Sequence, residues 1–129
     1  MKLHAFLGLA LSVLTAVAHS QPLDVVKLEQ QLSSPVQGRL KSSEAAARKG
    51  DYQAMRNFAY VWASEAAREQ PPAAIVGCAW YAVILKRHAD KAHAGDVSNK
   101  DLYCGRLNAD QARQAGALVV SIESQLPSP

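Results

Sequence analysis

Apolar side chains recur every three or four residues along most of the chain, and almost no stretch alternates apolar and polar residues as a half-buried strand does. This spacing is that of amphipathic helices, each with one face turned towards a core. The pattern predicts an all-α domain of about five helices. They are expected over residues 23–32, 40–49, 51–68, 73–87 and 108–126.

Glycine, proline and capping residues indicate where these helices begin and end. Gly50 can end the second helix and Asp51 can cap the third, which makes the two a helical hairpin with a tight turn. Pro71 and Pro72 suit the first turn of the fourth helix, where a missing N–H costs nothing. The first helix is expected to end at the Ser-Ser-Pro-Val-Gln-Gly run, residues 33–38, which separates it from the second helix.

The second half of the chain has an apolar helix, a polar segment and a capped helix. Residues 73–87 are apolar nearly all round, so this helix is expected in the middle of the domain. Residues 89–106 are polar and rich in turn-forming steps, which predicts a long loop. Asn108, with Gln111 three residues on, forms a capping box that begins the last helix. Its expected buried face comprises Ala112, Ala115, Val119, Ile122 and Leu126.

The first 20 residues have the pattern of a secretory signal peptide. Lys2 precedes an apolar run over residues 5–18, and small residues before Gln21 predict cleavage between Ser20 and Gln21. Cleavage leaves 109 of the 129 residues, enough for one small domain over 21–126, with a disordered tail at 127–129. We therefore expect a periplasmic or secreted protein whose mature chain does not insert into a membrane.

Charge composition argues against a nucleic-acid partner. After cleavage the chain carries 13 Lys and Arg against 11 Asp and Glu, interspersed along the sequence. A balance this even does not create the basic surface that nucleic acids require.

The two cysteines, Cys78 and Cys104, have one possible intramolecular pairing. In an exported protein an even cysteine count favours a disulfide, which would connect the fourth helix to the segment after it. The alternative is two buried thiols, because Cys78 lies on an apolar helical stripe where cysteine packs as a small hydrophobe.

Residues 40–87 resemble the SEL-like repeats, which are related to tetratricopeptide repeats. The resemblance rests on small residues where helices approach closely, a glycine that ends a helix, and late aromatic residues. The matching positions are Ala46, Ala47, Gly50, Asp51, Ala54, Asn57, Phe58, Ala59 and Trp62, followed by Gly77, Trp80 and Tyr81. It implies a helical hairpin repeat that acts as a scaffold in protein–protein interactions. One repeat matches well, so the disulfide and the terminal helices are expected to stabilise the rest.

Aromatic and basic residues on the third helix suggest where a partner binds. Tyr52, Arg56 and Tyr60 are the candidate partner-binding residues, because tyrosine and arginine dominate interface energetics. Trp62 and Trp80 are expected to fill the space between helices instead. The predicted function is an exported adaptor that receives a peptide or helix of a cell-envelope protein, in a groove between residues 40–68 and 73–87. A periplasmic, immunity-type inhibitor of a toxic effector is an alternative.

An enzyme or metal-binding protein is the alternative from another class. His88, Asp90, His93 and Asp96 could ligate a metal or move protons, but His88 and His93 lack the four-residue spacing that lets two imidazoles share a zinc ion on a helix. The chain also contains no Gly-x-Ser-x-Gly elbow and no glycine-rich phosphate loop. We therefore predict no catalytic residues and no cofactor.

Overall fold

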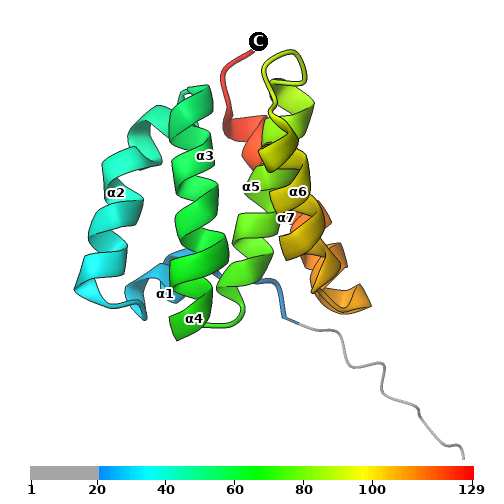
Figure 1. Ribbon diagram of the computed structural model, residues 1–129. Helices are drawn as coiled ribbons and strands as arrows, with labels where there is room; N and C mark the ends of the chain where they lie inside the picture. Colours follow the sequence, from blue (N-terminus) through cyan, green and yellow to red (C-terminus); the bar gives the residue numbers. More distant parts are fainter. Residues whose placement is uncertain (1–20) are drawn as a thin grey trace, which may run out of the picture.

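A computed structural model of the protein describes residues 21–129, so the predicted signal segment lies outside the described residues. The described chain is all-helical, without strands, and forms six helices (Figure 1). Their bounds are α1 (Val25–Gln30), α2 (Ser34–Arg48), a continuous helix made of α3 (Tyr52–Tyr60), η1 (Val61–Ala66) and α4 (Ala67–Glu69), then α5 (Ala73–Arg87), α6 (Ala94–Gly105) and α7 (Ala109–Gln125).

Helix α2 begins earlier than the sequence pattern predicted. It starts at Ser34, with Pro35 in its first turn, rather than at residue 40. Proline is tolerated there because the first N–H groups of a helix have no intrahelical acceptor. Gly38 lies inside the helix, where its lack of a side chain is a modest cost that packing overrides. The prediction of a break at residues 33–38 is therefore wrong, because most of these residues form the beginning of α2.

The predicted hairpin of α2 and α3 is confirmed, and its turn forms as the local residues require. Gly50 adopts a φ of 86°, a left-handed conformation that favours glycine. The carboxylate of Asp51 accepts a hydrogen bond from the amide of Ala54 at 2.8 Å and so caps α3.

The third helix contains a π-helical segment that the sequence did not reveal. Its backbone widens over Val61–Ala66, where the hydroxyl of Ser64 donates to the carbonyl of Tyr60 at 2.6 Å. Ala63 in this segment faces Gly77 of α5. The π-helical segment is therefore a place where the hairpin and α5 approach closely.

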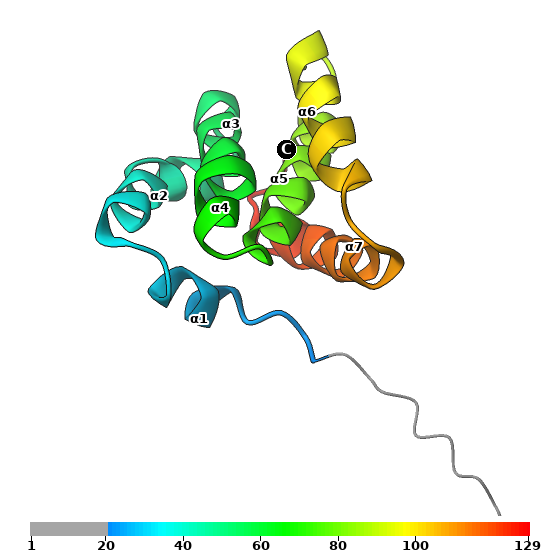
Figure 2. The ribbon, with the colours of Figure 1, turned by 60° about the horizontal axis from the view of Figure 1, so that its bottom comes forward.

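Helix α5 lies in the middle of the domain, as its all-round apolar character predicted. The α2–α3 hairpin packs on one side of it, and α6 and α7 pack on the other (Figure 2). Trp62 and Trp80 are 1% and 2% exposed, and both pack edge-to-face on Phe58. The prediction that the two tryptophans fill the space between helices is confirmed.

The prediction of a long loop at residues 89–106 is wrong, because most of these residues form α6. Its turn-forming residues, Gly95 among them, sit in the first helical turn or on the exposed side of the helix. The predicted disulfide is confirmed: Cys78 of α5 and Cys104 of α6 are bonded, with their α carbons 5.0 Å apart. The covalent bond thus holds the last turn of α6 against the central helix.

Helix α7 begins as predicted and buries part of its expected face. The side chains of Asn108 and Gln111 each accept from the other's amide, at 2.8 and 3.0 Å. Ala115 and Ile122 are buried, whereas Ala112 is exposed, so that part of the expected face is wrong.

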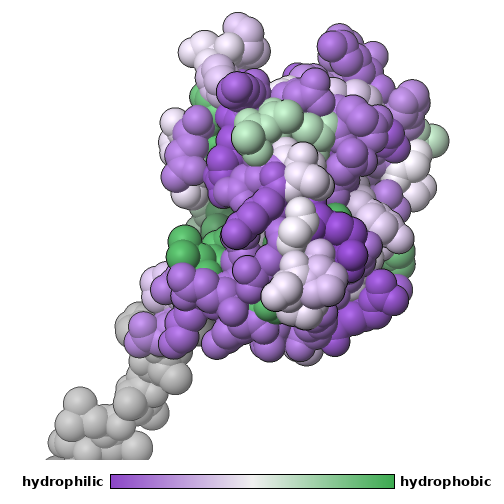
Figure 3. Space-filling view, turned by 90° about the vertical axis from the view of Figure 1, so that its left-hand side faces the viewer, coloured by the Kyte–Doolittle hydropathy of each residue, from purple (hydrophilic) through white to green (hydrophobic). Residues whose placement is uncertain are grey.

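The surface is predominantly polar. Figure 3 shows that the face on the α2 side is largely hydrophilic, with small hydrophobic areas. Large exposed apolar residues, such as Val26 and Val120, are spread over several helices rather than gathered on one. Among residues 21–129, none of the helices combines the length and apolarity needed to cross a bilayer.

Candidate functional site

The most deeply buried charged group in the described chain is the carboxylate of Asp96, which is 0% exposed. It lies in the first turn of α6, which begins after the extended residue His93. The backbone amide of His93 donates to Asp96 Oδ2 at 3.0 Å. A carboxylate in this position also interacts favourably with the positive end of the helix dipole.

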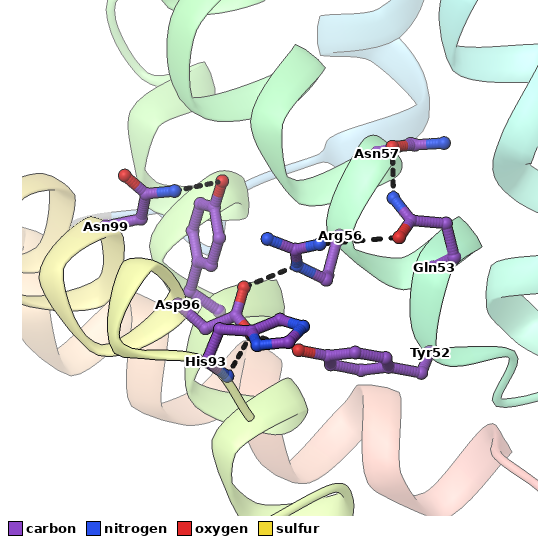
Figure 4. A network of polar contacts seen from close by, with 8 residues as sticks. Tyr52, Gln53, Arg56, Asn57, His93, Asp96 and Asn99 are labelled. Carbon is purple, nitrogen blue, oxygen red and sulfur yellow. Dashed lines mark hydrogen bonds and ion pairs between the residues drawn. The ribbon is translucent and has the colours of Figure 1, made fainter. Parts of the chain in front are cut away.

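Two side chains of α3 donate to the same carboxylate. Arg56 Nε donates to Asp96 Oδ1 at 2.6 Å, and the Tyr52 hydroxyl donates to Oδ2. Tyr52 and Arg56 are four residues apart, so they lie on one face of α3 and point together towards α6 (Figure 4). Asp96 therefore connects the hairpin to α6 across the domain.

Hydrogen bonding determines the ionisation of this cluster. Burial by itself would raise the pKa of Asp96, but the hydrogen bonds from Tyr52, Arg56 and the His93 amide outweigh it and hold the pKa below its ordinary value. The bond to Asp96 raises the pKa of Arg56, and burial raises the pKa of Tyr52. At neutral pH the site contains a carboxylate paired with a guanidinium.

A cavity of about 170 Å³ opens beside this ion pair, between α3, α5 and α6. Its lining is almost entirely polar, and consists of Gln53, Arg56, Asn57, Tyr60, Tyr81, Asp96 and Asn99. At the inner end the amide of Asn99 donates to the buried Tyr81 hydroxyl at 3.3 Å, and at the outer end Tyr60 is 50% exposed. The cavity is therefore open to solvent on the Tyr60 side and has a hydrogen bond between Asn99 and Tyr81 in its inner wall.

Aromatic rings surround Tyr52 and hold it in place. The ring centroids of His88 and His93 lie 5.3 and 6.1 Å from that of Tyr52, and the Arg56 guanidinium lies 5.5 Å from it. His88 Nε2 makes a 2.8 Å hydrogen bond with the Gly50 carbonyl, which ties α5's end to the hairpin turn. Tyr52 is thus a packed, structural residue.

The structure does not assemble the residues of the metal-site alternative. The carboxylate of Asp96 already accepts hydrogen bonds from Arg56 and Tyr52, whereas Asp90 is exposed after the end of α5. In residues 21–129 no three histidine, cysteine or acidic side chains come together in a way that could hold an ion. A carboxylate with a lowered pKa and three donors is also poorly suited to exchange a proton.

The three candidate partner-binding residues occupy different environments. Arg56 and Tyr60 line the cavity, whereas the hydroxyl of Tyr52 is directed at Asp96 behind it. Asn57, singled out for its place in the repeat pattern, is exposed and lines the cavity too. Arg56 and Tyr60 are therefore accessible from the cavity, whereas Tyr52 binds the Asp96 carboxylate that also holds Arg56.

Sequence reasoning missed Gln53 and Asn99 and misjudged Asp96. The sequence pattern predicts Asp96 in a loop, where it could ligate a metal. Its spacing to His93 is the signal that could have found it, because an acidic residue three positions after a helix start bonds back to the first amide. No comparable local signal marks Asn99, whose partner is on another helix.

A second hollow, of about 270 Å³, lies between α1, α2, α5 and α7. Val25, Val76, Trp80 and Ile122 make it more apolar than the first cavity. Glu29 is at its edge, and burial, followed by the nearby Glu44, raises the pKa of Glu29. Its lining also includes the charged or polar side chains of Glu44, Arg48, Ser121 and Gln125.

No family model, no curated protein and no solved structure matches the chain. A functional assignment therefore rests on the geometry of the site.

Proposed function

We propose that the protein is an exported scaffold that binds a peptide segment of a cell-envelope protein in the cavity between α3, α5 and α6. The observation that carries the proposal is the way Arg56 is held in the lining of the cavity. The buried Asp96 pairs with its guanidinium and so limits the orientations that the guanidinium can adopt. A side chain held in advance loses little conformational freedom on binding, which favours recognition.

Tyr60 supports the same conclusion at the outer end of the cavity. A half-exposed tyrosine beside a polar cavity supplies apolar contact area and a hydroxyl at low entropic cost. Export is supported by the signal-like pattern of residues 1–20, and the resemblance of residues 40–87 to SEL-like repeats supports a scaffold role. The Cys78–Cys104 bond suits an oxidising compartment.

The proposal is tested by capture of partners with tagged protein from an envelope extract, followed by binding of the purified partner. Tyr60→Ala is the informative variant, since Tyr60 is exposed and its loss should leave the fold intact. We expect it to weaken partner binding at least about tenfold, which corresponds to about 1.4 kcal/mol. Changes at Tyr52 or Asp96 would disturb the fold as well and are less informative.

The matched control is Leu102→Ala. Leu102 is 46% exposed, on α6, and does not line the cavity. It should leave binding unchanged. A partner that binds the wild-type protein and the Tyr60→Ala variant equally would exclude this cavity as the binding site.

A further inference from the structure

A hollow of about 320 Å³ lies between the η1–α4 segment and the end of α6. Two positively charged side chains line it, and its lining contains no negatively charged one. The lining consists of Ala63, Ser64, Ala67, Arg68, Tyr103 and Arg106. This arginine hollow occurs on the same two helices as the cavity beside Asp96, further along each of them.

Neither arginine of this hollow is neutralised within the described part of the chain. Among residues 21–129, the side chains of Arg68 and Arg106 make no ion pair and donate no hydrogen bond. The acidic neighbours of Arg68 in sequence have other partners. Glu65 pairs with an arginine of α2, and Glu69 accepts two hydrogen bonds from the N-cap residue of the same helix. The arginine hollow therefore carries two uncompensated positive charges.

The surroundings restrain one of the two guanidinium groups. The guanidinium of Arg106 lies 5.9 Å from the ring centroid of Tyr103, which stacks on the buried Tyr81 with centroids 5.8 Å apart. Helix α6 ends at Gly105, so the negative end of its dipole, equivalent to about half a charge, is close by. Two guanidinium groups outweigh that half charge. The hollow therefore favours an anionic ligand.

The spacing of the two sites fits one extended peptide. Tyr60 of the cavity and Arg68 of the hollow are eight residues apart on one helix, and Asn99 and Arg106 are seven apart along the other wall. At about 1.5 Å per helical residue, this separation is roughly 10–12 Å. An extended chain covers about 3.3 Å per residue, so about three or four peptide residues bridge it.

We propose that the arginine hollow binds a carboxylate of the segment that occupies the cavity, at a distance of about three or four residues from the group that contacts Tyr60. The planar guanidinium groups of Arg68 and Arg106 present paired N–H donors that match a carboxylate. This inference rests on the proposed function, because it assigns an acidic group to the same bound segment. The carboxylate is either an acidic side chain or the C-terminal group of the segment.

The test uses three nearly isosteric probes: N-acetylglutamate α-amide, N-acetylglutamine and the neutral N-acetylglutamine α-amide. Each is added at about pH 6, where both carboxylates are ionised, and at low ionic strength to ¹⁵N-labelled protein purified from cells that express the full chain. The backbone amide signals of Ser64 and Tyr103 report on the hollow. We expect saturable shifts with a carboxylate probe and at least about tenfold weaker binding of the neutral one. Tighter binding of N-acetylglutamate α-amide assigns the carboxylate to a side chain, and tighter binding of N-acetylglutamine assigns it to a chain end.

Matched variants separate recognition in the hollow from the net charge of the protein. Arg68→Gln/Arg106→Gln removes two positive charges from the hollow, and should weaken binding of the carboxylate probes at least about tenfold. Lys41→Gln/Lys49→Gln removes two exposed positive charges at α2, outside the hollow, and should change it less than about twofold. Equal losses in the two double variants overturn the inference. Equal binding of the neutral probe, or no saturable shift with either carboxylate, also overturns it.

Failure of this inference is distinguishable from failure of the proposed function. A captured protein partner whose binding depends on Tyr60 but is unchanged by Arg68→Gln/Arg106→Gln would retain the scaffold and refute the carboxylate site. Selective binding of the carboxylate probes without any protein partner would support the carboxylate site and refute the scaffold.

Discussion

Gly77 of α5 lies directly against Ala63 of the π-helical segment. A β carbon added at Gly77 would be 2.5 Å from both the α carbon and the β carbon of Ala63. Such a contact is far inside van der Waals distance, so the spacing between the hairpin and the central helix depends on the absence of a side chain at this position.

Gly77→Ala should therefore destabilise the protein although alanine is the better helix former. We expect a loss of about 1–3 kcal/mol, because the clash involves backbone that cannot move away without shifting a helix. Chemical denaturation would measure it. Gly116→Ala is the matched control, since Gly116 is exposed in α7 with open space around it, and it should gain about 0.5–1 kcal/mol. Equal effects of the two substitutions would contradict the close packing.

Acid should weaken the fold through Asp96. Because folding lowers the pKa of this carboxyl group, its contribution is complete above the unfolded value of about 3.9 and is lost as the pH falls through the lower folded value. Asp96→Asn should cost about 3 kcal/mol at neutral pH, since Arg56 loses its ionic partner but keeps partial access to solvent.

The pH dependence of that difference is the sharper measurement. Denaturation of wild type and Asp96→Asn from about pH 6 to pH 2 should show the two free energies of unfolding converging below about pH 4. Asp101→Asn, which removes a largely exposed carboxylate, should parallel the wild type throughout. A constant difference between wild type and Asp96→Asn would show that ionisation of Asp96 does not contribute.

Loss of the disulfide should loosen α6 more than the hairpin. Reduction, or the double variant Cys78→Ala/Cys104→Ala, should reduce stability by about 3 kcal/mol because the unfolded chain regains the freedom of the closed loop. Hydrogen exchange should then speed up first in α6, which this bond attaches to α5, and later in α3. Uniform acceleration along the chain would mean that α6 has no separate opening.

Tyr81 should titrate late in alkali. Burial, with a further contribution from the stacked Tyr103, raises the pKa of Tyr81 to about 12. Its contribution to stability is therefore present below the ordinary value near 10 and is lost as the pH rises through the folded value. Ultraviolet titration should show a phenolate step near pH 12 that disappears in Tyr81→Phe. Tyr60→Phe should retain that step.

The helical fold was largely predictable because its signals are local. Gly50, Asp51 and the Asn108–Gln111 capping box act on atoms within one turn, and all of them behave as expected. The all-round apolar character of α5 likewise reflects burial on every side. The sequence pattern does not predict the start of α2, where proline is tolerated in the first turn and packing overrides the modest cost of Gly38. It does not predict α6 either, because turn-forming residues such as Gly95 lie within that helix.

The candidate site was predictable only in part. Arg56 and Tyr60 were selected as residue types that dominate interfaces, and both line the cavity. Nothing near Asp96 in the sequence indicates that Tyr52 and Arg56, 44 and 40 residues earlier, donate to it. The sequence around Asn99 also gives no indication of its role, because its hydrogen-bond partner is the hydroxyl of Tyr81, 18 residues away on α5.

Local sequence thus accounts for most of the helices, the caps of α3 and α7, the hairpin turn and the pairing of the two cysteines, since each depends on atoms close in the chain or on the lack of another partner. Tertiary structure alone decides that the first turn of α6 faces Tyr52 and Arg56 of α3 (Figure 4). The physical reason is that a buried carboxylate needs hydrogen-bond donors close to it in space, whether or not they are close in sequence. Which donors it finds depends on how α6 packs against α5, and helical periodicity does not encode that packing.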